Sequence, residues 1–164
     1  MLQVRKLTVV SLLTAAAVVG RLAIHGFNMQ PATWIIILTG WFFGWKMGLA
    51  EGLMVGLVTD MVLGPGYWTP FQMTGWGLIG FISHFIPKKM PFHYGWLVIS
   101  GYLYGIVMAF SYLLVSTNIW TVVGMYLSGL IFDTYHAVGN LLFGIFSPLL
   151  FRVFEREKQS LGIK

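Results

Sequence analysis

This sequence contains no cysteine, few charged side chains and none of the motifs that mark the common enzyme classes. Without cysteine, disulfides and thiol chemistry are excluded. A Gly-x-Ser-x-Gly nucleophile elbow, a His-Glu-x-x-His zinc site and a phosphate-binding loop are all missing. We therefore expect no catalytic residue, no bound metal and no cofactor of the protein's own. If ATP drives its work, a partner must use that ATP.

The shortage of charge indicates a membrane protein. Charged residues make up 9% of the 164 residues, and the mean hydropathy is +0.80, whereas a soluble domain carries about 25% charged residues. This number of charges is too small to cover the surface of a soluble fold. We therefore expect most of the protein surface to contact lipid. At about 20 residues per span, the chain has room for about six helices. We expect a single all-α integral membrane domain over residues 1–164, a bundle of six transmembrane helices.

Apolar runs separated by glycine, proline and polar residues give the expected spans. They cover residues 7–27, 32–43, 47–63, 71–86, 94–115 and 120–150. The last run is too long for one perpendicular span. We therefore expect a last helix that is tilted or preceded by part of the run as a loop, with a bend near Gly124 or Gly129.

The basic residues alternate between the connections of these runs. They lie before the first run, after the second, after the fourth and after the last: Arg5, Lys6, Lys46, Lys88, Lys89, Arg152, Arg156 and Lys158. The other three connections contain neither lysine nor arginine. Cytoplasmic loops carry the excess of positive charge, so this pattern predicts six spans with both termini in the cytoplasm. It also explains the formal net charge of +5 without a nucleic-acid partner.

Charged side chains within the spans need a reason, because burial in lipid is costly. Arg21 in the first run and Asp60 in the third lie at similar depth, which favours a structural ion pair; a direct substrate contact is the alternative. Asp133 and His136 are three residues apart on one helix face. They fit ligand contacts, a proton relay or an internal hydrogen-bonded pair. Glu51 is expected to be hydrated near the cytoplasmic end of its helix.

Two connections on the outer side combine glycine and proline with amides and aromatic rings. Residues 28–31 and 64–73 are suited to rigid, shaped loops at the membrane face. Their side chains would form an amphipathic cup for a ligand with apolar area and many polar groups. The candidate contacts are Asn28, Gln30, Tyr67, Trp68, Phe71, Gln72 and Trp76. The alternative is the interfacial aromatic belt of membrane proteins, which does not require the amides.

A family resemblance rests on several of these stretches. They are the Ala15-Ala16-Ala17-Val18-Val19-Gly20-Arg21 segment, Gln30-Pro31-Ala32-Thr33, the glycines at 40, 44, 48, 52 and 56, and Gly64-Pro65-Gly66-Tyr67-Trp68-Thr69-Pro70-Phe71-Gln72-Met73, continuing through Trp76-Gly77 to Gly80. Together they resemble the S components of energy-coupling factor (ECF) transporters, the membrane subunits that bind vitamins for import.

The resemblance implies partners that the chain itself cannot replace. Such a protein binds its vitamin near the outer face of the bacterial plasma membrane and docks on a transmembrane coupling subunit, which two cytoplasmic ATPases drive. The small-residue face of the first helix would make the docking contact, here Ser11, Ala15, Ala16 and Gly20. Asp133 and His136 would join the outer-loop residues as substrate contacts.

The substrate and the function class have alternatives. The 64–73 loop most resembles cobalamin-type members, and an amide-edged corrin suits an aromatic-and-amide cup. Pantothenate or another small vitamin remains open, because Arg21 can bind a carboxylate. A six-span scaffold protein without ligand is an alternative of another class. A membrane enzyme would require Asp60, Asp133 and His136 to converge.

Overall fold

The computed structural model describes residues 2–24 and 26–163, and every regular element in them is helical. The elements are α1 (Leu2–Ala23), η1 (Gly26–Asn28), α2 (Ala32–Phe43), α3 (Trp45–Leu63), α4 (Thr69–Ser83), α5 (Met90–Ala109), η2 (Phe110–Leu114), α6 (Ile119–Gly144) and α7 (Ser147–Ser160). The two η elements are short 3-10 turns. The all-α prediction is confirmed for the described residues.

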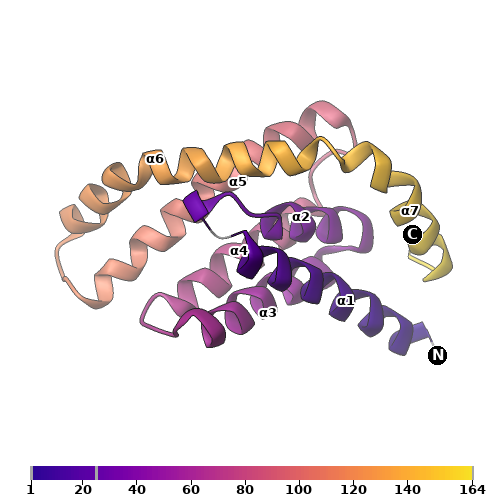
Figure 1. Ribbon diagram of the computed structural model, residues 1–164, viewed down its shortest axis with the longest axis horizontal. Helices are drawn as coiled ribbons and strands as arrows, with labels where there is room; N and C mark the ends of the chain where they lie inside the picture. Colours follow the sequence, from indigo (N-terminus) through magenta and orange to yellow (C-terminus); the bar gives the residue numbers. More distant parts are fainter. Residues whose placement is uncertain (1, 25, 164) are drawn as a thin grey trace.

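The helices form two groups that meet along their length (Figure 1). Helices α1 to α4 pack together, with α3 against α4 as the most extensive contact, and α5 packs along α6. Both chain ends lie at one end of the molecule, while η1, the α3–α4 connection and the η2–α6 connection lie toward the other (Figure 1). The three connections that lack lysine and arginine therefore share one end.

Helix length supports a membrane protein but gives fewer clear spans than the sequence predicts. Residues Val4–Ala23 and Met90–Leu114 are long and apolar enough to cross a bilayer, and the bent pair α6 and α7 gives a third candidate if it counts as one span. Helix α2 has 12 residues and α4 has 15, short of the roughly 20 that a perpendicular span needs. Helix α2 is buried at nearly every position, so neighbouring helices rather than lipid surround it.

Glycine allows the close approach of α2, α3 and α4. A Cβ atom at Gly80 would overlap the carbonyl oxygen of Gly48, and one at Gly40 would overlap the carbonyl oxygen of Gly80. One glycine from each helix thus brings three backbones into direct contact. Without a hydrophobic driving force between helices in lipid, such tight packing is a main source of stability.

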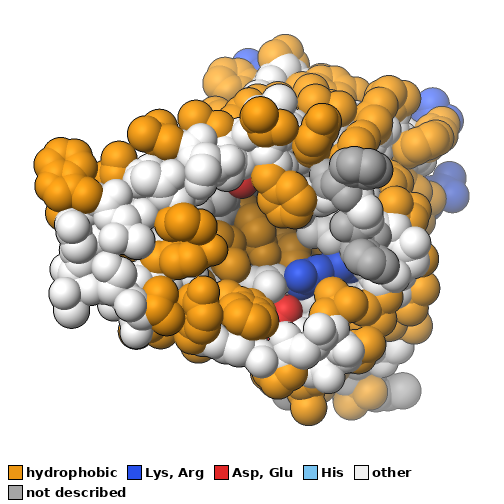
Figure 2. All heavy atoms as spheres, turned by 60° about the vertical axis from the view of Figure 1, so that its left-hand side comes forward, with side chains coloured by type: hydrophobic (Ala, Val, Ile, Leu, Met, Phe, Trp, Pro, Cys, Tyr) orange, Lys and Arg blue, Asp and Glu red, His pale blue; other side chains and the backbone are white. Residues whose placement is uncertain are grey.

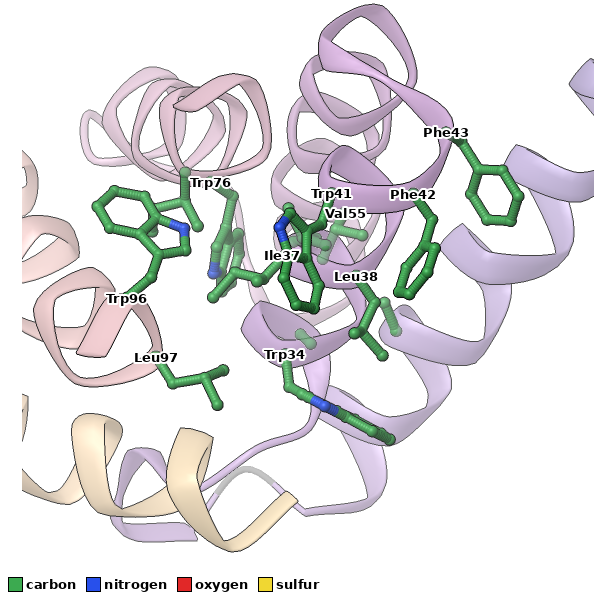
Figure 3. Close-up of a cluster of buried hydrophobic side chains, with 14 of the residues drawn as sticks. Trp34, Ile37, Leu38, Trp41, Phe42, Phe43, Val55, Trp76, Trp96 and Leu97 are labelled. Atoms are coloured by element: carbon green, nitrogen blue, oxygen red, sulfur yellow. The ribbon is translucent and has the colours of Figure 1, made fainter. Parts of the chain in front are cut away.

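Buried aromatic side chains fill the centre of the bundle (Figure 3). Each buried indole N–H has an acceptor, which removes the cost of an unpaired donor. Trp41 donates to the carbonyl oxygen of Ile86 at 3.0 Å, and Trp96 donates to the Ser83 hydroxyl at 2.7 Å. These bonds tie α2 and α5 to the end of α4 and the connection that follows it.

The last apolar run is broken rather than tilted. Helices α6 and α7 meet at 68° around Ile145 and Phe146, so the predicted bend at Gly124 or Gly129 is wrong. Ser147, the first residue of α7, anchors the break: it accepts a hydrogen bond from the Trp34 indole at 2.8 Å, and its hydroxyl lies 2.8 Å from His93 Nε2. Two buried polar partners from α2 and α5 therefore determine where the chain turns.

Two smaller expectations are also corrected. The first helix ends at Ala23 instead of 27, and η1 follows it. Glu51 is fully buried rather than hydrated, because its helix turns that face toward α2 and α4, where Gly48 and Gly52 make close contacts.

Candidate functional site

A cavity of about 540 Å³ opens at the end of the molecule opposite the chain termini. Figure 2 shows it as a hollow with hydrophobic side chains around it and basic and acidic atoms in its wall. Its lining comes from α1, α3, α4, α5, α6, both 3-10 turns and the connections beside them: Arg21, Asn28, Gln30, Leu63, Tyr67, Trp68, Gln72, Tyr104, Gly105, Met108, Ala109, Ser111, Tyr112, Met125, Tyr126, Ser128, Gly129, Phe132 and Asp133.

Arg21 is the cationic group of the cavity, and three neighbours hold its side chain. Its Nη1 donates a hydrogen bond to the Thr59 hydroxyl and lies 3.8 Å from Asp60 Oδ1. Its guanidinium Cζ lies 4.5 Å from the centroid of the Trp76 ring. Asp60 is almost fully buried, so the pair is shielded from water and its charges balance each other. The pairing expected from equal depth is thus present, and the same arginine also faces the cavity.

Tyr104 and Gln72 connect α5 and α4 beneath the opening. The Tyr104 hydroxyl donates to Gln72 Oε1 at 2.9 Å, and both side chains line the cavity. The Tyr104 ring packs on Trp76 at 4.9 Å between centroids. Trp76 is fully buried and donates to the Thr33 hydroxyl at 2.9 Å. An aromatic floor with satisfied donors therefore supports the polar groups above it.

The outer loops adopt fixed shapes at the rim. Gly64 follows the last residue of α3 with a φ of 110°, a left-handed value that favours glycine. The Gly66 backbone N–H then donates to the Thr69 hydroxyl at 3.0 Å. The Tyr67 ring makes edge contacts with Trp68 at 5.1 Å and with Tyr112 at 6.2 Å. These contacts link the α3–α4 connection to η2 across the opening.

Asn28 shapes the second rim segment. It is a non-glycine residue with positive φ, at 60°, a conformation that asparagine tolerates better than most residues. Its side-chain amide donates to the carbonyl oxygen of Phe132 on α6 at 3.4 Å. Gln30 follows in the same segment and is 3% exposed, so its amide is buried beside the cavity.

Asp133 is the acidic group of the cavity wall. It is 5% exposed, and its carboxylate lies against Gly105, where a Cβ atom would overlap it. Among residues 2–24 and 26–163, no donor makes a hydrogen bond or ion pair with this carboxylate. The absence of a side chain at Gly105 thus makes room for a buried acid that faces the cavity.

Most of the predicted contacts line one cavity, and three do not. Asn28, Gln30, Tyr67, Trp68, Gln72 and Asp133 are in its lining. Phe71, Trp76 and His136 are outside it. Trp76 forms the layer beneath, and the His136 Nε2 lies 2.7 Å from the Thr33 hydroxyl, inside the bundle. No hydrogen bond joins Asp133 to His136 in the described part of the chain, and Asp60 is engaged with Arg21.

Sequence reasoning missed the α5 and α6 side of the cavity. The missed α6 residues follow a helical stripe above Asp133, at Met125, Ser128, Gly129 and Phe132. Their spacing of three and four residues places them on one helix face. Extending the face of Asp133 toward the outer end of its helix would have found them.

The predicted docking residues of α1 differ in what surrounds them. Ser11, Ala15 and Ala16 are exposed on the side of α1 that no described helix covers. Gly20 instead turns toward Pro31, which a Cβ atom at that position would overlap. Gly20 therefore packs closely against the segment before α2, and its part in docking stays a prediction.

Comparison with protein-family models, with curated proteins and with solved structures finds no significant match to this chain.

Proposed function

We propose that this protein is the substrate-binding S component of an ECF-type importer for a vitamin or related micronutrient. The observation that supports this most is the cavity at the end opposite the termini. Its lining combines one acid, one arginine, three amides and several aromatic rings. Concave sites with a few convergent polar groups among aromatic side chains are typical of small-molecule binding. An aromatic belt alone would not place Asn28, Gln30 and Gln72 around one cavity.

The proposed topology is six passes with both termini in the cytoplasm of a bacterial cell. The alternation of basic residues supports it. The shared position of the two chain ends in Figure 1 agrees with an even number of passes. The short helices α2 and α4 would be accommodated by local thinning of the bilayer or by protein neighbours.

The energy for transport would come from partners. We assign no ATPase activity to this chain, and we propose that a transmembrane coupling subunit with two cytoplasmic ATPases drives it. The exposed small residues of α1, at Ser11, Ala15 and Ala16, would allow a partner helix to approach closely. Gly20, which packs against Pro31, is the fourth docking residue predicted from the sequence.

The size of the cavity bears on the substrate. A volume of about 540 Å³ lies within the range of roughly 300–1,000 Å³ that encloses drug-sized ligands. Pantothenate or another small vitamin would be largely enclosed, while cobalamin would leave much of its corrin outside. The cavity volume therefore favours the small-vitamin alternative, although the amide-rich rim keeps cobalamin as the second candidate.

Calorimetry on the purified protein without partners tests this proposal. The folded protein in detergent is titrated with a panel that contains pantothenate, thiamine, pyridoxamine and cobalamin. Saturable one-to-one binding of any of them supports the S-component function. If folded protein binds none of them, the ligand-free scaffold becomes the better interpretation.

A further inference from the structure

The cavity contains one acidic group that no described residue balances with an ion pair. Arg21 and Asp60 form a neutral pair, with Nη1 and Oδ1 3.8 Å apart. Asp133 is only 5% exposed. It nevertheless has no ion-pair partner among the described residues. Buried charges in proteins are normally paired or bound to a ligand.

The sequence offers no other fixed cation for Asp133. Neither lysine nor arginine occurs in residues 47–87 or 90–151, which include every part of the cavity lining after Gln30. His136 lies three residues further along α6, but its Nε2 contacts the Thr33 hydroxyl at 2.7 Å, and its Nδ1 has no hydrogen-bond partner among the described residues. No described residue thus supplies a counter-charge to Asp133, which leaves its carboxylate available to a cationic occupant of the cavity.

The surroundings of Asp133 suit a cation carried on an aromatic group. Six aromatic side chains line the same cavity: Tyr67, Trp68, Tyr104, Tyr112, Tyr126 and Phe132. Aromatic faces attract cations, and the attraction grows when water is excluded. Gly105 leaves the carboxylate space beside the α5 backbone, so a ligand can approach it from the cavity.

We propose that the natural ligand is a small organic cation, with a protonated or quaternary nitrogen at Asp133 and an aromatic ring among the cavity's aromatic side chains. This inference rests on the proposed function and narrows its substrate class. Arg21 is already balanced by Asp60, so it would contribute hydrogen bonds to neutral acceptors on the ligand. A free anion such as pantothenate would meet the unpaired carboxylate and bind less well.

Matched ligand pairs test the charge without altering the protein. Pyridoxamine carries an ammonium group where pyridoxine has a hydroxyl, and thiamine carries a quaternary nitrogen that the neutral thiochrome lacks. In calorimetry at pH 7, we expect at least one cation to bind about tenfold or more tightly than its neutral counterpart, since a charge-assisted contact contributes about 1.5–3 kcal/mol. Equal affinities within both pairs would overturn the inference.

Variants test whether Asp133 is the contact. Asp133→Asn keeps the shape and removes the charge, and we expect it to weaken binding of the preferred cation about tenfold or more. Glu155→Gln on α7 removes one negative charge outside the cavity lining and should bind like the unaltered protein. Undiminished binding by folded Asp133→Asn would overturn the inference.

The outcomes separate the inference from the proposed function. If pantothenate or cobalamin binds saturably while neither thiamine nor pyridoxamine does, the organic-cation assignment is wrong and the S-component function stands. If none of the four binds to folded protein, both are overturned. The matched ligand pairs are measured on the unaltered chain, so they remain decisive even where a variant does not fold.

Discussion

The guanidinium of Arg21 lies over the ring of Trp76, with 4.5 Å between its Cζ atom and the ring centroid. The same guanidinium pairs with Asp60 on α3. Helices α1, α3 and α4 are thereby joined at the base of the cavity by one side chain. An ion pair at this depth holds the helices in register and balances the charge of Arg21.

Removing one member of this pair should destabilise the fold. Asp60→Asn leaves Arg21 buried without a counter-charge, which costs about 3–5 kcal/mol when a buried pair is broken. We expect the free energy of unfolding, measured by titration with a denaturing detergent, to fall accordingly. The double variant Arg21→Met with Asp60→Leu removes both charges and should recover most of the loss. A double variant as unstable as the single one would contradict a structural role for the pair.

Packing of α4 on α3 should be sensitive to one methyl group. In Gly80→Ala the new Cβ would overlap the Gly48 carbonyl oxygen, and backbone cannot move aside as a side chain can. We expect a loss of about 3 kcal/mol or more in the free energy of unfolding. Gly95→Ala on α5 is the matched control, since its added Cβ has no atom within 4 Å beyond the adjoining backbone of its own helix. That variant should change stability by about 1 kcal/mol or less.

Sequence patterns predicted the helical class and most helix limits because lipid imposes a simple rule on composition. Apolar runs must be helical in a bilayer, so the runs 32–43 and 47–63 match α2 and α3 closely. The α6–α7 break was misplaced because its cause is not local. It depends on Ser147 meeting Trp34 and His93, which are far away in the sequence.

The candidate site was predictable where local chemistry marked it. Amides and aromatic rings concentrated in 64–73 indicated one rim of the cavity. The similar depth of Arg21 and Asp60 along their helices was enough to predict their ion pair. The contribution of Tyr104 could not be read in the same way, because its position depends on how α5 packs against α4 and α6. For the same reason, nothing local distinguished Trp76 beneath the cavity from Trp68 beside it.

Trp68 should contribute to ligand binding. Trp68→Ala removes an aromatic face from the cavity lining, and we expect about a tenfold or greater loss of affinity for the bound vitamin, as for aromatic contacts at binding sites. The matched control is Trp120→Ala. Trp120 is 73% exposed and does not line the cavity, so its loss should leave the affinity unchanged. Equal effects of both variants would favour an aromatic belt over a binding site.

The proposed topology can be tested with single cysteines, because the chain has none of its own. Thr117 and Lys88 are both exposed, in the η2–α6 and α4–α5 connections. In intact cells, a membrane-impermeant maleimide should label Thr117→Cys. It should label Lys88→Cys only after the membrane has been permeabilised. Labelling of both in intact cells, with a cytoplasmic control protein unlabelled, would contradict the six-pass arrangement.

The exposed small-residue face of α1 should matter for transport and not for binding. Ala15 lies at the centre of that face, where the described helices leave it uncovered. Ala15→Leu adds bulk that would hold a partner helix away, while the cavity more than one helical turn away keeps its lining. We expect vitamin uptake by cells that depend on this protein to fall at least tenfold, because close docking is lost. The affinity of the purified variant for the vitamin, measured by calorimetry, should be unchanged.

The control variant Ala50→Leu makes the same change at an exposed position on α3 and should leave uptake intact. Normal uptake with Ala15→Leu would mean that the coupling subunit docks on another face of the molecule.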